Sequence, residues 1–205
     1  MSYEFYRIGI PSALTCVLFQ FLEILNMYFA GHMGDAAILG GIGLGNMTVN
    51  LFAIAFIESM NAVVETMGSQ AAGNGNLKLA GIILNRGRVL LMYTFIPITF
   101  ILLNIKFFYL WAGQDEEIVD KMQTYMYFVV PGLAFYGIGD LQKRFLNSMG
   151  ISRLPMVCSL FSLFLHGGWV WLFAIYCDLG VVGFGMAVSL SNAITCISMI
   201  IMTNY

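Results

Sequence analysis

Long apolar stretches separated by short polar turns make up almost the whole sequence. A helix that crosses a bilayer needs about 20 mostly apolar residues, and six segments meet that requirement. They cover residues 8–30, 37–66, 80–111, 118–141, 154–177 and 180–203. Turn-forming runs such as Gly73-Asn74-Gly75-Asn76 separate them. The pattern predicts an all-α membrane protein in which residues 1–205 form one bundle of six transmembrane helices.

The composition agrees with a lipid environment, because 60% of the 205 residues are hydrophobic and only 10% are charged. A soluble domain carries roughly a quarter charged residues. The net charge of −2 is divided among the turns and forms no basic face, which excludes a nucleic-acid partner. We find no catalytic motif and no metal-like pair among the four cysteines. We therefore expect neither an enzyme nor a bound metal or cofactor.

The distribution of Lys and Arg predicts the orientation, since cytoplasmic loops near helix ends are enriched in them. If the N-terminus is cytoplasmic, seven basic residues share that side: Arg7, Lys78, Arg86, Arg88, Lys143, Arg144 and Arg153. Only Lys106 and Lys121 fall on the other side. Both termini are thus predicted to be cytoplasmic, in a multi-pass protein of the plasma or vacuolar membrane.

Polar residues within the apolar stretches are the candidates for function, because an ionisable group at membrane depth is costly and usually faces the bundle interior or water. In the first span Gln20, Glu23 and Asn26 recur every three residues. At about 100° per residue they share one helix face roughly 120° wide. We expect this face to be turned inward.

The second span carries a longer polar stripe, within about 120° on a helical wheel. Its members are Asn46, Asn50, Glu58, Asn61 and Glu65. In one interpretation the asparagines bond neighbouring helices and Glu65 caps the helix or reaches the interface. In the other, Glu23 and Glu58 exchange protons, since apolar surroundings disfavour a charged carboxylate.

Three further features have structural or functional interpretations. His166, the one histidine at mid-membrane depth, makes either an interhelical hydrogen bond or a proton site, and Asp140 is expected to pair locally with Lys143 and Arg144. Small residues in the last span predict a packing seam: Gly180, Gly183, Gly185, Ala187, Ser189 and Ser191. Aromatic residues toward the outer ends predict an interfacial belt: Trp111, Tyr125, Tyr127, Trp169, Trp171 and Tyr176.

Several stretches, read in order, resemble the multidrug and toxic compound extrusion (MATE) family in its eukaryotic branch. They are Ile10-Pro11, Phe29-Ala30-Gly31-His32-Met33-Gly34, Glu65-Thr66 with Gln70 and Gly73, Leu84-Asn85-Arg86, Gly113-Gln114-Asp115, Val130-Pro131-Gly132-Leu133, Arg144-Phe145-Leu146 with Pro155, and Leu179-Gly180 with Gly183 and Ala187. Each is weak alone, but their order covers nearly the whole chain.

The resemblance implies a twelve-helix exporter built from two six-helix lobes, of which this chain matches the N-terminal one. Such exporters move organic cations or related metabolites outward in exchange for H⁺ or Na⁺. In prokaryotic members, aspartates in the first and fifth helices serve the coupling ion, and the matching positions here are Asn26 and Val170. Glu23, one turn from Asn26 on the same face, is the candidate substitute.

The leading hypothesis is therefore antiport of a small organic solute, held at the interface of two lobes. Glu23 and Glu58 would exchange protons, and Asn26, Asn50 and Asn61 would supply hydrogen bonds. The second lobe would be a missing C-terminal half or a second copy of this chain. Three alternatives stay open: a non-transporting scaffold or regulatory subunit derived from a truncated transporter, a lipid flippase of the same superfamily, and an embedded lipid-modifying enzyme, which the missing catalytic set disfavours.

The predicted orientation can be tested with single cysteines in a background that lacks the native ones. A cysteine at Asn76 should resist an impermeant thiol reagent in sealed cells, whereas one at Gln114, on the opposite side, should react. Labelling at Asn76 in intact cells would reverse the assignment.

Overall fold

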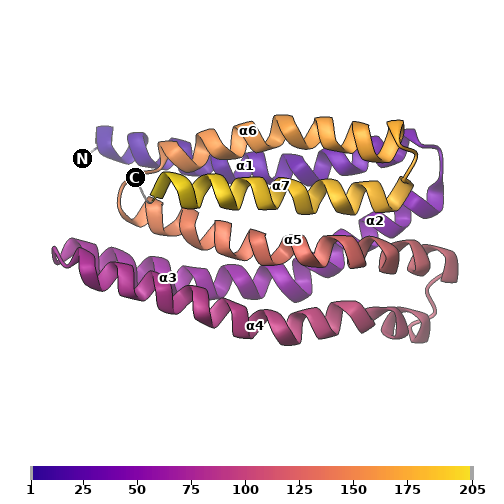
Figure 1. Ribbon diagram of the computed structural model, residues 1–205, viewed down its shortest axis with the longest axis horizontal. Coiled ribbons are helices and arrows are strands. Elements are labelled where there is room, and N and C mark those ends of the chain that lie inside the picture. Colours follow the sequence, from indigo (N-terminus) through magenta and orange to yellow (C-terminus); the bar gives the residue numbers. More distant parts are fainter. Residues whose placement is uncertain (1, 204–205) are drawn as a thin grey trace.

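Helices joined by short turns make up the computed structural model, which describes residues 2–203 (Figure 1). The elements in chain order are α1 (Ser2–His32), α2 (Ala36–Val49), η1 (Asn50–Ile54), α3 (Ala55–Gly73), α4 (Leu77–Trp111), α5 (Glu116–Ser148), α6 (Arg153–Val170), η2 (Trp171–Tyr176) and α7 (Gly180–Thr203). The π-helical stretches η1 and η2 join α2 to α3 and extend α6, so the described chain forms six rods. The side chain of Arg7, one of the basic residues behind the predicted orientation, lies outside the described residues.

The turns have local chemistry that stops one helix and starts the next. Asp35 caps α2 by accepting hydrogen bonds from the backbone N–H groups of Ala37 at 2.8 Å and Ile38 at 3.2 Å. Asn76 and Asp115 cap α4 and α5 in the same way. Such caps satisfy backbone donors that have no partner inside the helix. The helix ends are therefore encoded by the residues at the turns.

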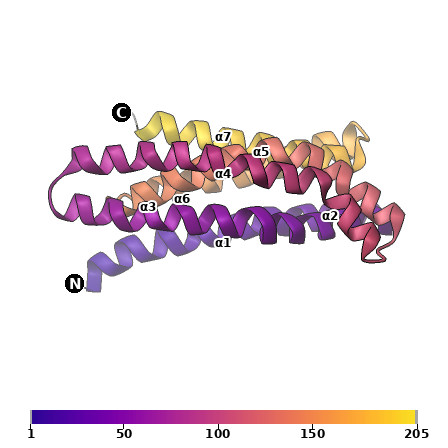
Figure 2. The ribbon, with the colours of Figure 1, turned by 90° about the horizontal axis from the view of Figure 1, so that it is seen from below.

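Helix α5 lies in the middle of the bundle, between the group α1, α6 and α7 on one side and the pair α3 and α4 on the other (Figure 1). Helix α1 begins and α7 ends at the same end of the bundle as the α3–α4 and α5–α6 turns, and Figure 2 shows the same arrangement from below. The alternation of turns between the two ends fits a chain that crosses a membrane repeatedly.

Five helical stretches of the described chain are long and apolar enough to cross a membrane, judged by length and composition. They are Gly9–His32, Ala36–Gly73, Leu77–Trp111, Arg153–Tyr176 and Gly180–Ile201. Helix α5 is not among them, because its uncharged middle, residues 122–139, contains Gln123, Thr124, Pro131 and several Tyr and Gly residues that lower its mean hydropathy. Its 33 residues nevertheless run alongside the other rods, and its middle is covered by protein. A helix surrounded by protein does not need the uniformly apolar surface that lipid requires.

Glycines let α7 approach its neighbours closely, as the small residues of the last span predict. A Cβ at Gly183 would lie 2.6 Å from the backbone nitrogen of Ala174, and one at Gly185 would lie 2.6 Å from Cβ of Phe128. On α5, a Cβ at Gly132 would lie 2.5 Å from Cα of Ser189. Because helices in lipid associate by packing rather than by the hydrophobic effect, the close approaches at Gly132 and Gly185 stabilise the α5–α7 interface, and that at Gly183 joins α7 to η2.

The π-helical stretch η1 was not predicted, since residues 37–66 were expected to form one uninterrupted α-helix. A π-helix accommodates more residues per turn than an α-helix, so residues beyond Ile54 are rotated relative to an ideal wheel. The rod also continues past residue 66 to Gly73. Hydrophobic patterns do not reveal such a change of hydrogen-bond register.

The α5–α7 contact can be tested by substituting Gly132 with Ala. The added methyl would clash with the Ser189 backbone, so we expect the thermal stability in detergent to fall by an amount typical of overpacking, about 1–3 kcal/mol. Gly81→Ala is the matched control, because a Cβ there meets nothing within 4 Å and alanine favours a helix. Equal stability of the two variants would contradict close packing at Gly132.

Candidate functional site

A cavity of about 50 Å³ lies in the middle of the bundle between α1, α2, η1, α5, α6 and α7. We call it the Glu23 chamber. Its polar lining consists of Glu23, Asn26, Asn46, Tyr125, Tyr136, His166, Ser191 and Asn192, and the rest of its lining is apolar. A water molecule needs about 10–15 Å³ of such space and two or more polar partners. The chamber can therefore hold a few waters or one small ion.

Glu23 enters this chamber from α1 and is held by an amide rather than by a cation. Asn50, the first residue of η1, donates from Nδ2 to both carboxylate oxygens of Glu23, at 3.2 and 3.3 Å. No ion pair involves Glu23 among the described residues. A carboxylate in this position is costly when charged, and protonation removes that cost.

A second set of contacts lines the chamber deeper in the bundle, around His166 of α6. Its Nε2 lies 3.0 Å from Oδ1 of Asn26, and its Nδ1 lies 2.9 Å from Oγ of Ser191. Only 1% of His166 and 2% of Asn26 are exposed. An Nε2–H tautomer would donate to Asn26 and accept from the Ser191 hydroxyl. The expected interhelical hydrogen bonds of His166 are therefore present, and they join α1, α6 and α7.

Tyr125 corrects one expectation from the sequence. It was assigned to the interfacial belt, but it is 1% exposed and donates from its hydroxyl to Oδ1 of Asn46 at 2.8 Å. Trp169 is half-buried. The other aromatic residues of the predicted belt are exposed: Trp111, Tyr127, Trp171 and Tyr176. Asn46 lies opposite Tyr125 and fixes the tyrosine hydroxyl at the chamber wall, a pairing that separate readings of two spans could not reveal.

Toward the end of the bundle where α1 begins, charged residues form a second cluster that we call the Arg144 cluster. It contains Glu58, Glu65, Asp140, Lys143 and Arg144. The buried Asp140 accepts from Nε of Arg144 at 2.8 Å and pairs with Nζ of Lys143 at 2.6 Å, which confirms the expected local ion pairs. Arg144 also reaches Glu65, with Nη1 at 3.1 Å from Oε2, and Glu58, with Nη2 at 3.9 Å from Oε2.

Asn61, which belongs to the polar stripe of the second predicted span, completes the connection between α3 and α5. Asn61 is buried and donates from Nδ2 to Oδ2 of Asp140 at 2.9 Å. The Tyr136 hydroxyl donates to Oε1 of Glu58 at 2.9 Å. Four of the five stripe residues therefore bond to α5, and only Asn50 turns toward α1.

Three of the eight predicted site residues, Glu23, Asn26 and His166, line the Glu23 chamber, and Asn50 reaches it through its bonds to Glu23. The remaining four lie elsewhere: Gln20, Glu58, Asn61 and Glu65. Glu58 lies in the Arg144 cluster, where an arginine and a tyrosine hydroxyl already hold it. Gln20 is exposed on the outside of α1. Around α1 the burial increases from exposed Gln20 through half-buried Glu23 to buried Asn26, so one edge of the 120° polar face meets the bundle and the other does not.

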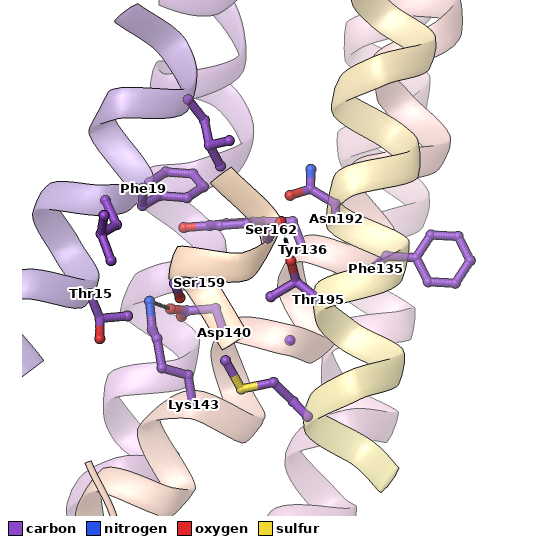
Figure 3. A pocket seen from close by; sticks show the side chains of 14 residues that line it. Thr15, Phe19, Phe135, Tyr136, Asp140, Lys143, Ser159, Ser162, Asn192 and Thr195 are labelled. Atoms are coloured by element: carbon purple, nitrogen blue, oxygen red, sulfur yellow. Dashed lines mark hydrogen bonds and ion pairs between the residues drawn. The ribbon is translucent and has the colours of Figure 1, made fainter. Parts of the chain in front are cut away.

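A second cavity of about 50 Å³, the Asp140 cavity, lies between α1, α5, α6 and α7 (Figure 3). Its polar lining comprises Thr15, Tyr136, Asp140, Lys143, Ser159, Ser162, Asn192 and Thr195. Figure 3 shows Asp140 and Lys143 joined at one side of it and Asn192 and Thr195 facing it from α7, while the ring of Phe135 points away. Sequence analysis missed Asn192 and Thr195, although their spacing of three places both on one face of a helix.

Comparisons with known proteins agree on one family. The MatE family model matches residues 11–171. Protein DETOXIFICATION 48 of Arabidopsis thaliana is 30% identical over 91% of this chain and 35% of its own length, and Multidrug and toxin extrusion protein 2 of Mus musculus is 29% identical over 84% and 30%. The chain thus spans about a third of the length of these relatives.

The fold matches as well. The crystal structure of the eukaryotic MATE transporter AtDTX14 superposes with a TM-score of 0.92 over 98% of this chain and 45% of that one, at 18% identity. This likeness confirms the predicted all-α membrane fold, one bundle of a MATE-type transporter. Because the family model covers most of the chain, this protein belongs to the MatE family of membrane transporters.

Proposed function

We propose that this chain is one lobe of a secondary antiporter that exports small organic solutes in exchange for H⁺, and that Glu23 exchanges the proton. The observation that carries the proposal is the hydrogen bonding of Glu23 to a neutral group. It is a carboxylate at membrane depth, in a cavity, and its described partner is the neutral amide of Asn50. Glu58, Glu65 and Asp140, in contrast, are paired with Arg144.

Na⁺ is the alternative coupling ion, and the chamber offers it few free oxygen ligands. Oδ1 of Asn26 already contacts His166, and Oδ1 of Asn46 already accepts from Tyr125. A hard cation needs several oxygen ligands at once. A proton needs only one carboxylate oxygen, which favours H⁺ at Glu23.

The charge of the chamber supports an organic cation as the solute rather than an anionic lipid. Its described lining includes Glu23 and contains neither Lys nor Arg. A lipid flippase of the same fold would need basic groups to receive a phosphate headgroup. A chamber of about 50 Å³ is too small for the organic cation itself, which would lie at the interface of the two lobes.

Transport also requires a second six-helix lobe in this proposal, because alternating access rocks one bundle against another around a site at their interface. Polar groups on the surface of this bundle support the presence of a second lobe that covers them. Gln20 is exposed, and the side chains of Glu58 and Glu65 are 42% and 37% exposed. Lipid contact at these groups would be costly. All six rods would cross the bilayer, with the Arg144 cluster toward the cytoplasm.

The role of Glu23 can be tested in vesicles that contain both lobes, by uptake of a fluorescent organic cation with and without a pH gradient. One proton moving across 100 mV supplies about 2.3 kcal/mol, enough for roughly 50-fold accumulation. Glu23→Gln keeps the shape and cannot exchange the proton, so we expect it to abolish gradient-driven accumulation. Replacing the pH gradient with a Na⁺ gradient tests the alternative ion.

Glu58→Gln is the matched control for that experiment. Glutamine can still accept from Tyr136, so this variant should keep proton-driven accumulation even if its stability falls. Full pH-driven transport by Glu23→Gln at wild-type expression would show that Glu23 is structural.

The need for a second lobe is tested by the activity of the chain alone. A verified monomer in nanodiscs or vesicles should give no gradient-driven efflux, because one bundle has no partner to move against. Its mass should be fixed in the same preparation used for transport. Efflux by a monomer would disprove this requirement, while efflux by a dimer would identify a second copy as the missing lobe.

A further inference from the structure

The Asp140 cavity and the Glu23 chamber are neighbours along the bundle. They share four lining residues: Phe19, Leu22, Tyr136 and Asn192. The rings of Phe19 and Tyr136 stack between α1 and α5, with centroids 4.9 Å apart and planes inclined by 29°. This ring pair lines both spaces and forms the partition between them.

A series of hydrogen bonds on α6 and α7 passes the partition. The Thr195 hydroxyl lies in the Asp140 cavity and donates to Oγ of Ser162 at 2.7 Å. Oγ of Ser162 in turn lies 3.4 Å from the carbonyl oxygen of Ser191, whose hydroxyl contacts His166. His166 then reaches Asn26 in the Glu23 chamber. Polar groups therefore lie along the way from one cavity to the other, and the hydrogen bonds are interrupted at Ser191, between its carbonyl and its hydroxyl.

The far side of the Asp140 cavity approaches the end of the bundle where α1 begins and α7 ends. Asp140 and Lys143 pair at this side (Figure 3). Lys143 keeps 16% of its side chain exposed, whereas the Asp140 side chain is fully buried. A cavity with this many polar groups favours water, since each water can find two or more partners there.

We propose that the Asp140 cavity is a hydrated passage, separate from the solute site, by which water reaches the Glu23 chamber and protons leave it at the end of the bundle that carries Lys143. Each water accepts one proton and releases another to its neighbour, so the net change is one proton moved from a carboxylate oxygen of Glu23 to bulk water at that end. The passage of protons rests on the proposed antiport, but the hydration of the cavity does not.

Hydration can be measured with Ag⁺, a thiol-reactive cation close to water in size, on chain whose four native cysteines have been replaced. Ser159→Cys places a thiol in the cavity, and Leu160→Cys places one on the exposed apolar surface of the same helix. Ag⁺ added from the Lys143 side should modify the Ser159→Cys thiol about 100-fold faster than the Leu160→Cys thiol, because hydrocarbon excludes ions. Equal rates, or faster reaction from the opposite side, would overturn the proposal.

Filling the cavity gives a second test. Thr15 lines it, and among the described residues its hydroxyl bonds only to its own helix, through the Pro11 carbonyl. Thr15→Leu should slow Ag⁺ modification of Ser159→Cys about tenfold by displacing water, whereas Val17→Leu, on the exposed side of α1, should not. An unchanged rate in a Thr15→Leu protein of normal thermal stability would count against passage through this cavity.

The partition is tested with Val188→Cys, which lies in the Glu23 chamber. This thiol should react more slowly than Ser159→Cys from the Lys143 side, and Phe19→Ala should bring the two rates together. If Phe19→Ala left the rate of Ag⁺ modification of Val188→Cys unchanged, the cavities would not communicate. These rates are read without transport, so a dry cavity refutes the passage alone, while loss of proton coupling in a hydrated cavity would refute only the proposed antiport.

Discussion

The buried carboxylate of Asp140 sets the constraint around which α5 and its neighbours are arranged. A charge at membrane depth is stable only with partners, and Asp140 has Lys143, Arg144 and Asn61. Removing one partner of a buried pair costs about 3–5 kcal/mol. Arg144 continues from Asp140 to Glu58 and Glu65, so neutralising this one group also fixes α3 against α5.

That arrangement determines which carboxylate is available for exchange. Lys143 and Arg144 serve three carboxylates on α3 and α5, and neither contacts Glu23. Glu23 relies instead on the amide of Asn50. The separation divides the polar interior into a charged part with a structural role and a nearly neutral part with a cavity. Among the described carboxylates of the interior, Glu23 in the second part can change its charge without breaking an ion pair.

Much of the fold follows from the sequence, because apolar length and turn chemistry act locally. The inward polar stripe was also predictable, since Asn46, Asn61 and Glu65 all reach α5. The partners across helices were not, because spacing within one helix says nothing of its neighbour. Glu58 therefore seemed equivalent to Glu23, and Tyr125 was placed in the belt rather than beside Asn46. The exposure of Gln20 was not predictable, because a wheel defines a face but not which edge of it the neighbouring helices cover.

The π-helical stretch η1 has a mechanical consequence for the rod formed by α2 and α3. It begins at Asn50, the residue whose side chain holds Glu23. A π-turn has a wider hydrogen-bond register than the α-helices around it, so it is the natural joint of the rod. The Glu23 carboxylate is thus bonded to the first residue of that joint. A gain or loss of charge on Glu23 would change the strength of its hydrogen bonds to Asn50. It would therefore change how firmly the angle between the two halves of the rod is held.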